Sequence, residues 1–99
     1  MLDQLQLSRF QPLVGQRFVL RSDVEGGADL HLVLVEVNAL AHGDGRPRTP
    51  FSLVFRGPAS PVMAQRIYRL EHEALGTLEL FLVPIGRNAQ GVRYEAIFT

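Results

Sequence analysis

The chain has 99 residues, of which 46% are apolar, and its ten arginines and ten acidic residues give a formal net charge of zero. This is the size of one small domain, spanning residues 1–99, and the apolar content is enough for a core. There is no cysteine, which excludes disulfides, thiolate nucleophiles and Cys-ligated zinc, and the zero charge argues against binding by neutralising many phosphates.

The first segment predicts a short helix. Asp3 is a suitable N-cap, and Gln6 follows three residues later as in a capping box. Pro12 discourages helix beyond Gln11. A helix of about two turns is not stable alone, so its apolar side must pack on the domain or on a partner, and we expect it to close one open end of the sheet.

The rest of the chain changes to a period of two, which is typical of strands. The segment 30–37 is apolar on both faces in its middle, which predicts a central strand covered on two sides or a bend where inward and outward faces exchange. Six segments are expected to be strands: 17–21, 30–37, 51–55, 66–72, 78–83 and 92–98.

The connections between these segments are mostly short, which favours antiparallel pairing. Six strands with one apolar face each must curl to bury it. The predicted fold class is therefore mainly β, a small six-stranded antiparallel barrel or roll with one short N-terminal helix.

Alternation also assigns individual positions. Ser52 is expected to point outward, His72 to be a buried and hydrogen-bonded core residue, and Pro84 with Gly86 to end the fifth strand. In that strand the leucines at 78, 80 and 82 share one face. The opposite face is also apolar, so the helix or a partner must cover it; it carries Phe81, Val83 and Ile85.

The loop at residues 40–50 holds the main candidates for chemistry. Arg46 and Arg48 flank Pro47 on a semi-rigid loop and, with Arg56 on the following strand, could grip carboxylates of a partner. The alternative is a pocket for a small ligand or a minor enzymatic site, lined by His42, Asp44, Arg46 and Arg56.

No catalytic motif supports the enzymatic alternative. The serines lack a nucleophile-elbow context, the histidine spacing does not suggest a three-ligand metal site, and the loop around Gly43 lacks the lysine of a phosphate-binding loop. We therefore expect no catalytic residue, no metal and no cofactor.

Four strings in the second half carry a family resemblance: PFSLVFRGP, QRIYRLEHEALG, LELFLVPIGR and RYEAIF, with a looser match at LVGQRF. In this order they resemble a family of small bacterial proteins catalogued only as a domain of unknown function. The resemblance implies an association with proteins similar to phage-tail-collar fibres, and hence a role in assembling or decorating a protein filament.

These observations favour a non-enzymatic protein–protein interaction module, with Arg46, Arg48, Arg56 and Phe81 as partner-binding residues. Its expected partner is a protein, through self-association or contact with a filament or tail-collar-like protein, and no nucleic acid or membrane is expected. A single-stranded nucleic-acid binder is a third alternative. The N-terminal residues lack signal-peptide features, so the expected location is the cytoplasm, with export by a specialised machine left open.

Overall fold

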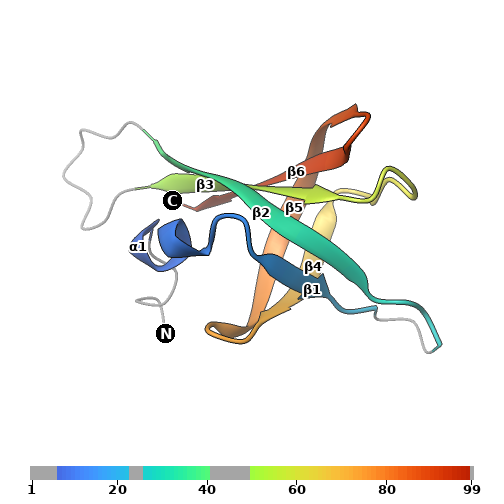
Figure 1. The fold of residues 1–99 in the computed structure, drawn as a ribbon, viewed down its shortest axis with the longest axis horizontal. Helices are drawn as coiled ribbons and strands as arrows, with labels where there is room; N and C mark the ends of the chain where they lie inside the picture. The colour runs from blue at the N-terminus through green and yellow to red at the C-terminus, as the bar shows by residue number, and fades with distance from the viewer. Residues whose placement is uncertain (1–6, 23–25, 41–49, 99) are drawn as a thin grey trace.

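The computed structural model describes residues 7–22, 26–40 and 50–98, and Figure 1 shows the arrangement of their elements. A short α-helix and a 3₁₀ turn precede six strands. Their bounds are α1 Leu7–Phe10, η2 Gln11–Leu13, β1 Arg17–Leu20, β2 Leu30–Ala39, β3 Phe51–Gly57, β4 Arg66–His72, β5 Gly76–Asn88 and β6 Gly91–Phe98.

The six strands close into a barrel in the order β1-β2-β3-β6-β5-β4, and every pairing is antiparallel. The closing seam is short, because β1 pairs with β4 only at Val19 with Glu71 and at Leu20 with Leu70. The segment after β3 crosses to β4, which is not its neighbour in the ring. The predicted fold class is confirmed.

Strand β2 changes faces at a β-bulge. Leu34 pairs with Phe55 and Glu36 with Val54, so Val35 is an extra residue. Before the bulge Leu34 points into the core, and after it Val37 packs against the core, although the two lie an odd number of residues apart. The apolar middle of this segment therefore marks a bend, as one of the two sequence interpretations predicted.

Strand β3 is buried on both faces, so Ser52 lies on the outward face, as predicted, but is buried there. The side chain of Ser52 is 2% exposed and that of Val54 3% exposed, although both lie opposite the core-facing residues of this strand. β3 lies between β2 and β6, and Arg93 of β6 forms an ion pair with Glu36 of β2 across it. The paired side chains of Arg93 and Glu36 thus cross the outer face of β3 beside Val54.

Strand β5 is longer than predicted and continues through Pro84 to Asn88. Beyond Leu82 the strand pairs with β6 alone among the described strands, and an edge position tolerates a residue without an N–H. A second bulge, between Pro84 and Gly86, absorbs the irregularity. Pro84 and Gly86 were expected to end the strand, but the pairing with β6 continues past both residues.

Helix α1 lies beside the end of the barrel where β2 ends, β3 begins and β6 ends (Figure 1). The Phe10 ring is fully buried, and its centroid lies 5.8 Å from that of Phe51 and 5.9 Å from that of Phe98. The predicted cap at Asp3 and Gln6 lies outside the described residues. Pro12 ends the α-helix, as expected, but the chain continues as a 3₁₀ turn to Leu13.

Candidate functional site

Two of the predicted partner-binding residues, Phe81 and Arg56, lie within the described part of the chain. His42, Asp44, Arg46 and Arg48 lie outside it, so their convergence on one site stays a prediction. Arg56 is near the far end of β3 from that loop, five residues after Phe51, which corresponds to about 16 Å of extended strand.

Phe81 belongs to an outward surface of the hairpin formed by β4 and β5. Phe81 is 49% exposed, and Ile67, its cross-strand neighbour on β4, is 60% exposed. We call this surface the β4–β5 face. Its outward side chains are Ile67, Arg69 and Glu71 of β4 and Thr77, Glu79, Phe81 and Val83 of β5.

The charges of the β4–β5 face form their own row. Arg69 lies directly opposite Glu79, one step along the face from the pair Ile67 and Phe81. Both side chains are exposed, and in the described part of the chain neither forms an ion pair. The face is therefore apolar at one end, with a cation and an anion side by side in its middle.

Helix α1, the described part of the N-terminal segment, does not cover this face. Phe10 anchors α1 on Phe51 and Phe98, which belong to β3 and β6. Alternation in the sequence singled out Phe81, but it did not identify Ile67 as its neighbour. That assignment needs the register between β4 and β5, although Ile67 was already on the outward side of its strand.

Arg56 belongs to a second surface, a cross-strand row of three arginines and one valine on four strands. In the described residues Arg17 and Arg56 form no ion pair, while Arg93 is held by Glu36. Arg17 and Arg56 also line an open hollow, together with Gly15 and residues of the β4–β5 turn. The cross-strand row consists of Arg17, Val33, Arg56 and Arg93.

Sequence reasoning missed Arg17. Its outward position follows from alternation, but its place beside Arg56 depends on β1 and β3 both pairing with Val33 of β2. No short sequence motif signals such a row, because its members lie far apart in the chain.

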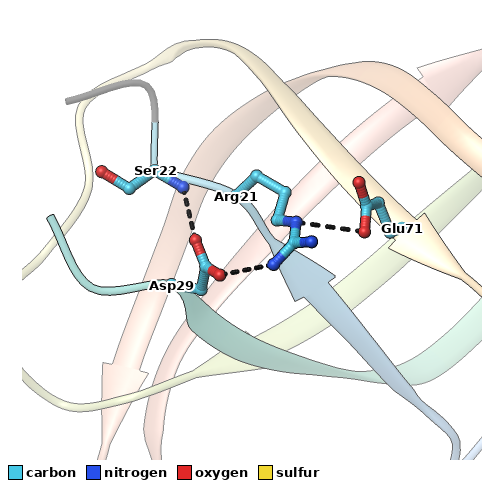
Figure 2. Close-up of polar contacts among 4 residues, drawn as sticks. All are labelled: Arg21, Ser22, Asp29 and Glu71. Atoms are coloured by element: carbon cyan, nitrogen blue, oxygen red, sulfur yellow. Dashed lines mark hydrogen bonds and ion pairs between the residues drawn. The ribbon is translucent and has the colours of Figure 1, made fainter. Parts of the chain in front are cut away.

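A cluster of polar residues lies at the seam where β1 pairs with β4, as Figure 2 shows. The Arg21 guanidinium lies between two carboxylates, with its Nη1 2.7 Å from Asp29 Oδ2 and its Nε 3.1 Å from Glu71 Oε1. The Ser22 backbone N–H donates to Asp29 Oδ1 at 2.8 Å. These contacts join the end of β1 to the start of β2 and to β4, so the cluster is structural.

The same contacts shift the pKa values of the charged side chains that form them. The Ser22 N–H and then Arg21 lower the pKa of Asp29 below its ordinary value, and Asp29 with Glu71 raises the pKa of Arg21. On the other side of the barrel, hydrogen bonds from Asn38 and then Arg93 lower the pKa of Glu36. Both ion pairs join different parts of the sheet: Arg21, next to β1, pairs with Glu71 of β4, and Arg93 of β6 pairs with Glu36 of β2.

His72 is a hydrogen-bonded core residue, as predicted. Its side chain is 8% exposed, and its Nδ1 accepts the Ala74 backbone N–H at 3.0 Å. Nε2 therefore carries the proton and donates to Gln16 Oε1 at 2.7 Å. Both ring nitrogens of the imidazole thus form hydrogen bonds, one with a backbone N–H and one with a side-chain amide oxygen.

Among residues 7–22, 26–40 and 50–98, no three histidine, aspartate or glutamate side chains are placed to hold a metal ion. In the same residues no helix has the length and apolar character needed to cross a membrane.

Comparison with known proteins places the chain in a family. It belongs to the family described as "Domain of unknown function (DUF6916)", which matches residues 5–98. No curated protein and no solved structure matches it.

Proposed function

Because the family's description assigns no activity to its members, we propose a function from the surface of this chain: a non-enzymatic protein–protein interaction module that binds its partner through the β4–β5 face. The observation that carries the proposal is the pair Ile67 and Phe81, 60% and 49% exposed on adjacent strands of the same face.

The physical argument concerns what an outward aromatic side chain contributes. Binding energy at protein interfaces is concentrated in a few large side chains that become desolvated, and aromatic residues are prominent among them. An exposed Phe81 beside Ile67 offers such a centre, and Arg69 with Glu79 provides a polar border. A partner that covers this face removes apolar surface from water without changing the packing of the barrel core.

The finer proposal is an accessory or assembly subunit of a larger protein structure, such as a tail-like fibre or filament, acting in the cytoplasm. Its support is the family resemblance carried by the four sequence strings together with an interaction face on a small rigid barrel. The engaged ring nitrogens of His72 also favour binding over acid–base chemistry at that residue.

Affinity capture from the native cells tests the proposal. The wild-type chain is compared with Phe81→Arg, which places a charge at the apolar end of the face. Val62→Arg is the matched control, because Val62 has the same 49% exposure and lies between β3 and β4, off the face. We expect Phe81→Arg to reduce the captured protein at least about tenfold and Val62→Arg to leave it unchanged.

Identical capture by all three chains, together with self-association that Phe81→Arg leaves unchanged, contradicts the proposal. Circular dichroism must first show that Phe81→Arg folds; if it does not, Phe81→Ala replaces it, with a smaller expected loss.

A second candidate function is binding of a small anionic ligand in the hollow that Arg17 and Arg56 line. The two guanidinium groups flank Val33 and form no ion pair within the described residues. Arg side chains recognise carboxylates and phosphates through paired hydrogen bonds. Native mass spectrometry of the purified protein tests this candidate: a bound anion lost in Arg56→Gln supports it, and an unliganded spectrum from freshly lysed cells counts against it.

A further inference from the structure

Resting on the proposed function, we infer that the β4–β5 face binds a second copy of this chain, in a two-fold dimer whose axis runs parallel to β4 and β5 and between them. The charge pattern of the face selects this occupant and this orientation.

The face consists of three cross-strand rows: Ile67 with Phe81, Arg69 with Glu79, and Glu71 with Thr77. A two-fold axis parallel to the strands and between them exchanges β4 with β5 of the facing copy. Each residue of a row then lies over the other residue of the same row. Arg69 lies over the partner's Glu79, and Ile67 lies over the partner's Phe81.

The other in-plane axis gives a worse contact. An axis across the strands through the charged row places Arg69 over the partner's Arg69 and Glu79 over the partner's Glu79. Like charges facing each other at an interface are unfavourable, whereas opposite charges fix the register of a complex. The parallel axis is therefore the isologous arrangement that the charges favour.

The charged row is available for such contacts. Arg69 and Glu79 are exposed and, among the described residues, have no ion-pair partner, although they lie opposite each other. Glu71 already forms an ion pair with Arg21 of its own chain, so it does not face the second copy's Thr77 as an unpaired charge. The zero net charge of the chain also removes the long-range repulsion that opposes self-association.

The dimer is expected to be weak. The face presents seven outward side chains, whereas a standard protein interface uses about 20–30 residues a side. Dissociation should therefore occur on dilution, and the measurement must cover protein concentrations from about 1 µM to about 1 mM.

The test is a charge exchange between two variants, followed by sedimentation velocity. Arg69→Glu alone places two carboxylates over each other in both symmetry-related contacts, and Glu79→Arg alone places two guanidinium groups together in both. Each variant alone should lose self-association at least about tenfold relative to wild type. Mixed in equal amounts they should form a heterodimer, because both contacts across the axis then join opposite charges.

The mixture separates contacts between chains from contacts within one chain. Within each variant chain, residues 69 and 79 carry like charges, and mixing does not change this. Only pairing between the two different chains can therefore restore association. Arg9→Glu mixed with Glu73→Arg is the matched control. It carries the same net charges on exposed positions off the face, and we expect no gain on mixing.

Three outcomes overturn the dimer: a wild-type chain that is monomeric up to about 1 mM, a dimer that Phe81→Arg leaves intact, or a mixture that stays monomeric. The first and third leave the proposed function standing if Phe81→Arg still abolishes capture of another protein. The proposed function is contradicted instead when Phe81→Arg changes neither the amount of captured protein nor the self-association of the chain.

Discussion

Gly91 shows at the residue scale how one position sets the geometry of a hairpin. It begins β6 after a two-residue turn in which Asn88 Oδ1 accepts the Gln90 N–H at 2.8 Å. Its φ is +137°, and an added Cβ would lie 2.1 Å from the Gly57 backbone oxygen. Only glycine allows both this backbone conformation and this close approach between β6 and β3.

We predict that Gly91→Ala lowers the free energy of unfolding by about 2–4 kcal/mol, because it combines a disfavoured φ with a clash against backbone. Urea denaturation provides the measurement. Gly86→Ala is the control, since nothing lies within 4 Å of a Cβ there, and it should change stability by less than about 0.5 kcal/mol. Equal effects of the two substitutions would contradict this account of the hairpin.

At the element scale, α1 depends on its packing. Four helical residues do not form a stable helix in isolation. Phe10 attaches the helix to the barrel, where its ring contacts Phe51 and Phe98 and is completely buried. The aromatic pair beneath it is itself stacked, with Phe51 and Phe98 centroids 4.6 Å apart.

Phe10→Ala should therefore cost about 3–5 kcal/mol of stability, the usual range for deleting a buried aromatic ring. Chemical denaturation followed by circular dichroism measures it, with Val14→Ala as a control because Val14 is 47% exposed. A loss below about 1 kcal/mol would show that the helix is not part of the cooperative core.

The strands and their inward faces could be predicted from the sequence because alternation records which side of a strand meets the core. The face exchange in β2 was visible for the same reason. The burial of Ser52 and the place of Pro84 inside a strand could not be predicted, because Ser52 lies between the neighbouring strands β2 and β6 and Pro84 is tolerated through its pairing with β6. Such long-range neighbours leave no local pattern.

The residues of the candidate site were also only partly predictable from the sequence. Phe81 stood out because it breaks the alternation of the leucines around it. Its neighbour Ile67 and the arginine row at Arg17 and Arg56 became evident only from strand register. A residue's direction is thus encoded locally, while its neighbours across the sheet are not.

At the scale of the whole molecule, stability should depend on pH through two of the ion-paired carboxylates, Asp29 and Glu36. The folded-state pKa values of Asp29 and Glu36 lie below their ordinary values of 3.8 and 4.5. A lowered pKa means that the unfolded chain binds protons first, so the stabilisation is complete above these ordinary values and is lost as the pH falls below them.

Unfolding free energies measured by urea denaturation should accordingly decrease as the pH is lowered from about 5 towards 2. Part of that slope should disappear in the double variant Asp29→Asn, Glu36→Gln, which lacks both titrating groups. An unchanged slope in the double variant would contradict the assigned roles of the Arg21 cluster and of the pair between Arg93 and Glu36.

The whole molecule also has one predicted interaction face, and a photo-crosslinking residue at position 81, expressed in the native cells, tests it most directly. We predict a covalent adduct to protein at position 81, identified by mass spectrometry as a second copy of the chain or another protein, and none from the same residue at position 62. Absence of a protein adduct at position 81, or equal adducts at both positions, would contradict the claim that the β4–β5 face binds protein.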